Sequence, residues 1–374
     1  PVKQTGTIEP LPFDAAAIKM AEALYQQFEG NLSMLDKLTG RNLVVDQVID
    51  ADTGESTVAT RRVEEYLVSV GKRHQFNVAL ASPDSMADAQ YIVTGIIRHE
   101  PAPWRDHKEK AYRIAASVVG IKSALVLANQ DAWVANRTIQ NQPVSIYADA
   151  PIYLKDSLID AKIRTAQTAP GQTVSPAYRD ALPSEALAAA AGVKFDQGDY
   201  LAASKAYQAV LARPDGRTLK AYAGLYQSFK KLNQPREAEA AFAGLISKAV
   251  EQNRVSIKFL FEVNSVEFFR GIEMSRDYPM WLRQLAKSVR ASQKCLDIQG
   301  HSSRSGTEQY NQQLSLQRAR YLQTLMQPDF PDVMQRSVAV GRGFRDNIIG
   351  SGTDDIQDAV DRRVDFLIRD CAAS

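Results

Sequence analysis

The spacing of apolar residues predicts a definite order of helices and strands in the first part of the chain. Residues 14–29 have helical spacing with Asp14 as the expected N-cap, and a second helix is predicted over residues 56–73. Strands are predicted at 41–50, 75–82, 89–100 and 111–130, the last long enough to bend or break. The order β-α-β followed by β-β predicts an α/β or α+β domain over residues 1–146.

The pattern weakens after this domain and then changes to helices. Residues 147–183 include "TAQTAPGQTVSPAYRDALP", which is rich in Pro, Gly, Ser and Thr and lacks apolar periodicity. Such composition predicts a linker. Residues 184–253 are rich in alanine and have helical spacing.

The helical region shows internal similarity. Ala203 and Tyr207 recur as Ala238 and Phe242, 35 residues later. This pattern resembles the tetratricopeptide repeat, in which small residues let helices approach and an aromatic residue fills the space between repeats. The resemblance implies a groove that binds protein segments. However, Lys194 stands where the pattern prefers an aromatic residue. Only about two repeats fit, so a helical spacer is an equal alternative.

A third pattern occupies residues 254–374. Val255, Ile257, Phe259, Phe261 and Val263 alternate and predict a strand that ends at 264–265. Further strands are predicted at 294–301, 336–343 and 362–370, and helices at 278–290 and 307–326. Strands that alternate with helices favour α/β units. The chain is therefore predicted to be a multidomain protein with two α/β domains around a helical middle.

Composition excludes several classes of function. The chain has 374 residues, 45% of them hydrophobic and 24% charged, which is ordinary for two or three globular domains. The net charge of +2 gives no overall attraction to nucleic acid or to a membrane surface. Its apolar runs are far shorter than the ~20 residues that a membrane helix needs.

Candidate catalytic and metal-binding residues are sparse. His99 and His107 flank two acidic residues in "HEPAPWRDH", but a polar loop between strands explains them better than a metal site. The two cysteines form no Cys-x-x-Cys motif. The sequence contains no Ser/His/Asp set, no cysteine paired with histidine and no phosphate-binding loop. We therefore expect a protein that is not an enzyme and that takes no metal or cofactor.

Two resemblances suggest a cell-envelope protein. The blocks "FEVNS", "IQGHSSRSG", "YNQQLSLQRAR", "VAVGRG" and "DRRVDF" occur in this order within residues 255–371. Through them the segment resembles the OmpA-like domain shared by OmpA, Pal and MotB. The resemblance implies a βαβαβαβ fold that binds the diaminopimelate-bearing stem peptide of peptidoglycan without covalent chemistry. "ADAQYIVTGII" and "NQDAWVANRTI" resemble, more weakly, the N-terminal α/β domain of envelope proteins of the FlgO and CsgG kind, which implies an interaction domain.

The OmpA-like resemblance also implies a ligand site. The stem peptide offers an ammonium and carboxylates, so an acidic acceptor and a basic donor have to lie close together. The basic residue of the family matches Arg318, which shares a helix face with Asn311 and Ser315. We expect its guanidinium to present a planar, two-pronged donor to a carboxylate. The acidic residue of the family is replaced by Ser303.

The missing acid is expected to weaken this site. A neutral acceptor at Ser303 would lower the affinity by about tenfold, or ~1–2 kcal/mol. Arg304 adds a positive charge that repels an ammonium, whereas Asp361 would replace the lost carboxylate if it borders the pocket. Asn264 and Arg363, from the first and last blocks, complete the expected peptidoglycan-binding set.

The same resemblance implies a disulfide between Cys295 and Cys371. In the family's sheet the last strand runs antiparallel beside the second, so these cysteines would meet at its edge. The bond would close a loop of 75 residues, worth roughly 4 kcal/mol in the chain-entropy model. Oxidation is compatible with the periplasm, whereas two free thiols would suit the cytosol.

These patterns predict a periplasmic anchoring and scaffolding protein, an accessory of an envelope-spanning secretion or flagellar machine. Its partners would be peptidoglycan and other envelope proteins, and not nucleic acid. The alternative is a protein-docking scaffold whose OmpA-like domain has lost wall binding. The chain begins at Pro1 without a signal segment, so we expect a mature or trimmed chain. A lipidated cysteine before Pro1 would tether it to the outer membrane.

Overall fold

The computed structural model describes most of the chain and divides it into two compact units. The described residues are 9–33, 42–104, 110–137, 139–270, 273–347 and 361–371. The first unit comprises 1–148 with 154–216, and the second comprises 149–153 with 217–374. Within the described residues no helix has the length and apolar character required to span a membrane.

The first unit contains a mixed sheet. Its strands are β1 (Asn42–Val45), β2 (Ile49–Asp50), β3 (Asn77–Leu80), β4 (Tyr91–Pro101), β5 (Lys110–Gly120) and β6 (Val126–Trp133). The order is β3-β1-β4-β5-β6, and β2 pairs with β4. Strands β1 to β4 pair in parallel, whereas β5 and β6 are antiparallel. The predicted break within 111–130 occurs between β5 and β6, and the expected pairing of 89–100 with 111–130 is the antiparallel pair β4–β5.

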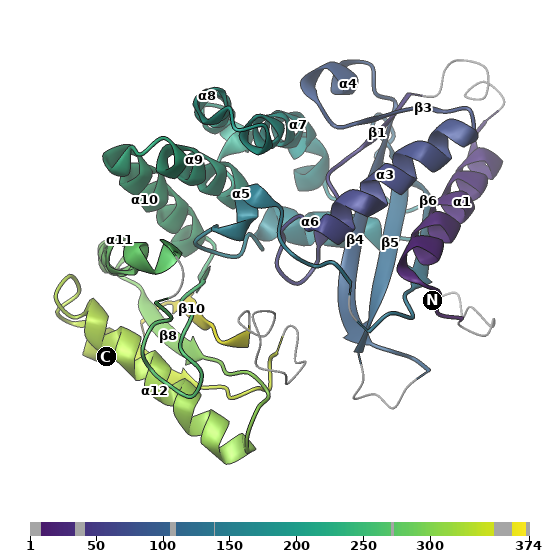
Figure 1. Cartoon of the computed structure of the whole chain (residues 1–374). Helices are drawn as coiled ribbons and strands as arrows, with labels where there is room; N and C mark the ends of the chain where they lie inside the picture. Colours follow the sequence, from purple (N-terminus) through teal and green to yellow (C-terminus); the bar gives the residue numbers. More distant parts are fainter. Residues whose placement is uncertain are drawn as a thin grey trace. The chain divides into compact units, whose positions relative to one another are not determined.

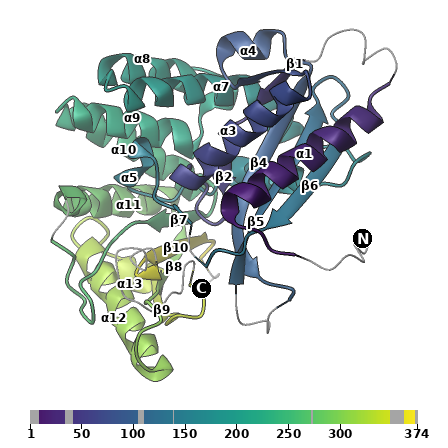
Figure 2. The same cartoon turned by 45° about the vertical axis from the view of Figure 1, so that its right-hand side comes forward.

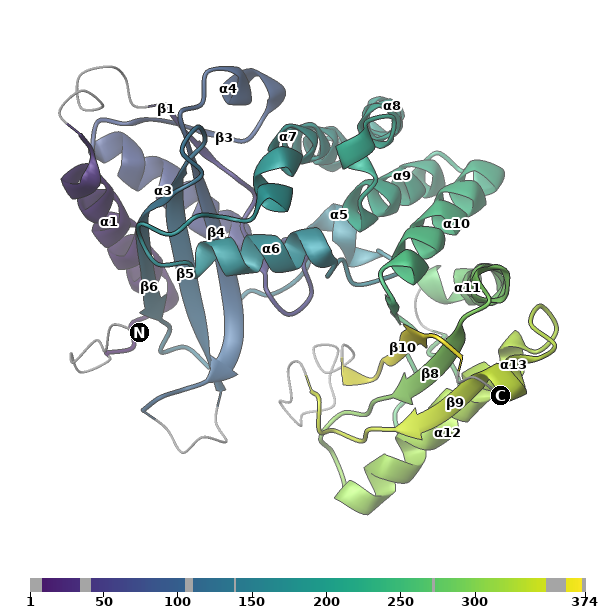
Figure 3. The same ribbon diagram turned by 180° about the vertical axis from the view of Figure 1, so that it is seen from behind.

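Helices cover both faces of this sheet. Helices α1 (Phe13–Asn31) and α3 (Val58–Arg73) lie side by side on one face (Figure 1, Figure 2). Helix α6 (Ser157–Ala166) crosses the other face (Figure 3). Between the sheet and the first two helices lies an apolar core that includes Tyr25, Phe28 and Phe76. A short helix α4 (Pro83–Ala87) and α5 (Ser145–Ala148) complete the connections.

Two local predictions in the first unit are wrong. Helix α1 starts at Phe13 with Pro12 in the N-cap position, and Asn136 Oδ1 accepts the Phe13 N–H at 2.9 Å. Asp14 instead pairs with Arg62 of α3 at 2.9 Å. The single strand predicted over 41–50 is divided into β1 and β2, because the Val48 N–H donates to a side chain, Glu64 Oε1, at 2.8 Å.

The expectation of an irregular segment over 147–183 is also wrong in part. It contains α6 and the first residues of α7 (Pro176–Asp196). Asp156 caps α6 by accepting the Ile159 N–H at 2.9 Å, and Ile159 and Ile163 are buried. The Pro/Gly-rich composition of 167–175 masked this short apolar pattern.

The predicted helical region forms two pairs of helices. Helices α7 and α8 (Tyr200–Leu211) form the first, and α9 (Leu219–Lys231) and α10 (Pro235–Glu251) the second. The repeated residues Ala203, Tyr207, Ala238 and Phe242 are all buried. The boundary between the two compact units, near residue 216, falls between these pairs. The tetratricopeptide assignment stays a prediction.

The second unit contains a four-stranded sheet with the order β7-β10-β8-β9. Its elements are β7 (Arg254–Ile257), α11 (Tyr278–Ser292), β8 (Cys295–Gly300), α12 (Glu308–Met326), α13 (Val333–Arg336), β9 (Ser337–Gly341) and β10 (Val364–Arg369), with a 3-10 turn at Glu273–Asp277. Helix α12 lies along one face of this sheet (Figure 3). The predicted strands at 294–301, 336–343 and 362–370 and both predicted helices are confirmed.

The first strand of this unit is shorter than predicted. It ends at Ile257 because the next N–H, that of Lys258, donates to Pro151 O at 2.9 Å. Phe259 and Phe261 remain buried, but Val263 lies in a turn and is exposed. The third helix of the expected βαβαβαβ order would fall largely within 348–360, outside the described residues.

Candidate functional site

Two glycines bring α12 close to the sheet of the second unit. A Cβ atom at Gly300 would lie 1.9 Å from Ser315 O, and one at Gly341 would lie 2.3 Å from Gln312 O. Only glycine permits such close approach of helix and strand backbones. As a result, the Asn311–Ser315–Arg318 face of α12 lies directly against the end of β8, where the loop 301–306 begins.

Polar side chains on this face hold the surrounding loops. Asn311 Nδ2 donates to Ser305 O at 2.6 Å and to Thr307 O at 3.1 Å. Ser315 Oγ accepts the Gly343 N–H at 2.9 Å. Asn311 and Ser315 are both buried. The predicted shared face is therefore present, and it orders the loop after β8 and the turn after β9.

Arg318 is placed differently from the expectation. Its side chain is only 1% exposed. Nε donates to Ser265 O at 3.0 Å, Nη2 to Glu262 O at 3.0 Å and Nη1 to His301 O at 3.4 Å. The guanidinium also lies 4.9 Å from the ring centre of Phe261. In this structure the expected two-pronged donor is directed at backbone carbonyls, because the turn after Phe261 folds over the helix.

The other predicted residues surround this arginine at different depths. Ser303 is 5% exposed, and Asp361 is fully buried. Both take part in interactions within the protein. Asn264 is exposed in the turn before Ser265, with a positive φ of 55° that asparagine tolerates well. The structure therefore brings most of the predicted set to one end of the domain and leaves Asn264 at its surface.

Arg363 belongs to a buried ionic cluster that sequence reasoning missed. Its Nε lies 3.1 Å from Asp365 Oδ2, and His301 Nε2 lies 3.2 Å from the same oxygen. Ser256 Oγ donates to Asp365 Oδ1 at 2.5 Å. Burial opposes ionisation of Asp365, but the Arg363 guanidinium, His301 and Ser256 together hold the pKa of this carboxyl well below its usual range.

A signal for this cluster was present in the sequence. Arg363 and Asp365 occupy alternate positions of a strand whose other alternate residues, Val364 and Phe366, are apolar and buried. Alternation therefore places the two charges on one face of β10. His301, the residue directly after the neighbouring strand β8, lies next to them, since the His301 N–H donates to Arg363 O at 2.9 Å.

Several buried polar atoms near this end of the domain have no hydrogen-bond partner in the described part of the chain. They include His301 Nδ1, Ser302 Oγ, Gln312 Oε1 and Arg363 Nη1. Buried donors are almost always satisfied, by protein, by water or by a ligand. The end of β8 and the start of β10 therefore offer unused hydrogen-bonding capacity.

The predicted disulfide is present at the opposite end of the same strands. Cys295 and Cys371 are bonded at 2.05 Å. Strand β10 runs antiparallel to β8 and pairs Arg369 with Cys295, as the expected topology requires. Among the four histidines, His99 stacks on Tyr112 with ring centres 4.5 Å apart, and His107 lies outside the described residues.

Comparison with known proteins finds only distant likenesses. No family model matches the sequence. No curated protein matches it either. Among solved structures, an outer membrane protein from Borrelia burgdorferi B31 has 22% identity, covers 31% of this chain and 88% of that chain, and has a TM-score of 0.24.

Two further structures are similar at the same level. The OmpA-like domain of FopA1 from Francisella tularensis subsp. tularensis SCHU S4 has 19% identity and a TM-score of 0.25, over 31% of this chain and 73% of that chain. A MotB-like protein from Desulfovibrio vulgaris has 17% identity and a TM-score of 0.27, over 36% and 96%. These values assign no function to the chain.

Proposed function

We propose that this chain is a non-enzymatic protein of the bacterial cell envelope whose C-terminal domain binds peptidoglycan stem peptides. The proposal is supported by the five OmpA-like sequence blocks and by their positions at one end of the second unit. The observation that carries it is the group of buried polar atoms without partners beside the loop 301–306, which includes donors on Ser302 and Arg363. A polar ligand with carboxylates would satisfy such donors.

The charges of this site differ from those expected for an OmpA-like domain. The loop 301–306 contributes Arg304 and no carboxylate. Asp365 is already engaged by Arg363 and His301. We therefore infer that the domain holds a carboxylate of the ligand more firmly than an ammonium, and that its affinity is lower than that of a family member with the acid.

A second function is favoured by the burial of Arg318. Each of its three guanidinium nitrogens donates to a backbone carbonyl, so this side chain stabilises the loops around it. This arrangement suits a protein-docking scaffold that keeps the fold and has lost wall binding. Both functions agree with a periplasmic location, which the disulfide supports.

We also propose a place for this chain within a larger envelope assembly. An α/β interaction domain, two helical pairs and a wall-binding domain would suit an accessory of a secretion or flagellar machine. Other envelope proteins would then bind the first unit. A lipidated cysteine before Pro1 would add an outer-membrane anchor.

Sedimentation with diaminopimelate-type peptidoglycan tests the main proposal. We expect the full chain to sediment with the wall and free stem tripeptide to release it. Arg318→Lys keeps a charge in the buried position but loses the planar donor, and we expect weaker binding. Arg320→Ala is the matched control, because Arg320 is on the same helix but is exposed. A wild-type chain that never sediments would contradict wall binding and favour the docking scaffold.

A further inference from the structure

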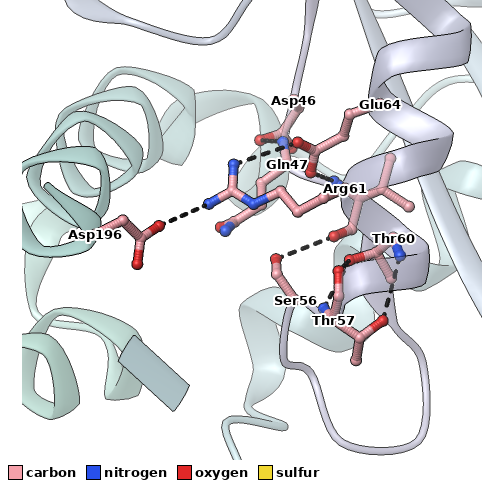
Figure 4. Close-up of polar contacts among 9 residues, drawn as sticks. Asp46, Gln47, Ser56, Thr57, Thr60, Arg61, Glu64 and Asp196 are labelled. Carbon is pink, nitrogen blue, oxygen red and sulfur yellow. Dashed lines mark hydrogen bonds and ion pairs between the residues drawn. The ribbon is translucent and has the colours of Figure 1, made fainter. Parts of the chain in front are cut away.

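The first unit holds an arginine between two carboxylates that come from different helices. Arg61 of α3 lies with Nη1 3.4 Å from Glu64 Oε2 and with Nη2 3.8 Å from Asp196 Oδ2 (Figure 4). Charge-assisted hydrogen bonds are normally about 2.7–2.9 Å long. The guanidinium is therefore shared, and neither carboxylate holds it at the optimal distance.

Glu64 is the buried partner of this arginine. It is 2% exposed, and its Oε1 accepts the Val48 N–H at 2.8 Å. Lys162 of α6, a second cation near it, is engaged by Asp46 at 2.7 Å, and Tyr178 of α7 also donates to Asp46 at 2.8 Å. The ionised form of Glu64 thus depends on Arg61 for its nearest counter-charge.

The electrostatics agree with this geometry. Burial raises the pKa of Glu64 to about 7, although Arg61, the Val48 N–H and Lys162 act against the rise and Asp46 adds to it. A change between pH 5.5 and 8 therefore changes the charge of Glu64.

Asp196 is the more exposed partner, and it lies at a point where a negative charge needs support. It is the last residue of α7, and the C-terminal end of a helix carries partial negative charge. Ser145 of α5 donates a hydrogen bond to it. Asp196 therefore links the end of α7 to both α3 and α5. Its ion pair with Arg61 becomes stronger when Glu64 no longer attracts the guanidinium.

We propose that Arg61 is a proton-controlled clamp between α3 and α7. With Glu64 protonated, Arg61 pairs with Asp196 alone and holds the end of α7 against α3. With Glu64 ionised, Arg61 is drawn toward the buried carboxylate and its hold on α7 weakens. The α7–α8 pair is thereby more firmly attached to the α/β sheet in mild acid than at alkaline pH.

Hydrogen exchange on the full chain tests this clamp at pH 5.5 and at pH 8. Amide exchange is measured in peptides that cover residues 193–203, and Asp196→Asn is compared with wild type at the same pH. We expect this variant to speed exchange about two- to fivefold at pH 5.5, the range that a partly exposed ion pair supports, and much less at pH 8. Glu64→Gln keeps an acceptor for the Val48 N–H but removes the ionisable group. In this background we expect Asp196→Asn to speed exchange by the same two- to fivefold factor at pH 5.5 and at pH 8.

A matched control separates the clamp from general effects of charge on α7. Asp180 is on the same helix, pairs with the adjacent Arg179 and is 61% exposed, so Asp180→Asn should leave exchange at 193–203 unchanged at both pH values. If Asp196→Asn in the otherwise wild-type chain speeds amide exchange equally at the two pH values, the proposal is overturned. A pH dependence that persists in the Glu64→Gln background would overturn it as well.

Discussion

Glu64 in the first unit and Asp365 in the second are both buried carboxylates, 2% and 4% exposed. Burial raises the pKa of Glu64 to about 7, whereas the pKa of Asp365 lies well below its usual range. The difference comes from their partners. Glu64 shares one arginine at 3.4 Å with a second acid, but Asp365 has Arg363 at 3.1 Å, His301 at 3.2 Å and the Ser256 hydroxyl.

The comparison shows that the depth of burial alone does not decide the charge of a carboxyl group. Desolvation opposes ionisation in both cases, and the number and distance of the donors decide which form is favoured. The same contrast predicts opposite responses to pH. The second unit should lose stability in acid, and the first should lose stability as pH rises through neutrality.

The largest effect is expected from removing the Asp365 charge. Asp365→Asn leaves Arg363 and His301 buried beside a neutral group, which should lower the free energy of unfolding of the second unit by about 3–5 kcal/mol. Because the folded pKa of Asp365 is depressed, its contribution in wild type is present above the unfolded pKa and is lost as pH falls. Urea unfolding at pH 7 and pH 3 measures this. A variant as stable as wild type at pH 7 would contradict the described cluster.

A smaller loss is expected from opening the disulfide at the other end of β10. Replacing Cys295 and Cys371 by serine should lower the stability of the second unit by roughly 2–4 kcal/mol, because the unfolded chain gains freedom. Thermal unfolding with and without reductant measures it, and the reductant should affect only wild type. Titration of the unfolded, unreduced protein should find no free thiol, and two per chain would exclude the bond.

Glu64→Gln should remove part of the pH dependence of the first unit. The folded pKa is raised, so the wild-type contribution is complete below the unfolded pKa of about 4.5 and is lost as pH rises through about 7. The loss is roughly 3 kcal/mol at most. Unfolding at pH 5.5 and pH 8 should show a smaller difference in the variant than in wild type. Asp50→Asn is a useful second variant, since burial raises the pKa of Asp50 to about 6 in the same unit.

The smallest effect concerns ligand affinity. Ser303→Asp returns a carboxylate to the loop near the cations of the second unit, and should tighten binding of the stem peptide by about tenfold, or ~1–2 kcal/mol. Calorimetry with the soluble peptide measures it, with Ser303→Asn as the uncharged control. Equal affinity of the two variants would mean that another group, such as Asp361, already accepts the ammonium.

Much of the second unit could be predicted from the sequence. Alternating and helical spacing located β8, β9, β10, α11 and α12, and the resemblance implied the pairing that brings the cysteines together. The motif also identified Arg318 as a residue of this region. Its burial could not be predicted, because the carbonyls that it contacts come from two segments distant from α12 in the sequence, the turn at 262–265 and His301 after β8.

The first unit shows the same limit. Helical spacing predicted α1 and α3, but the N-cap of α1 and the break after β1 depend on side chains far away in the chain, Asn136 and Glu64. Helix α6 was missed because its one buried face extends over only three turns beside a Pro/Gly-rich stretch. Short elements of this kind acquire their stability from packing rather than from local sequence.

The sequence by itself determined which residues are apolar, their periods and the types of chemical group near each strand end. These properties act between near neighbours and fix most elements. Only the tertiary structure decided which charges share a partner: Arg61 between Glu64 and Asp196, and Asp365 between Arg363 and His301. The physical reason is that charge states depend on desolvation and on distances between residues that the fold alone brings together.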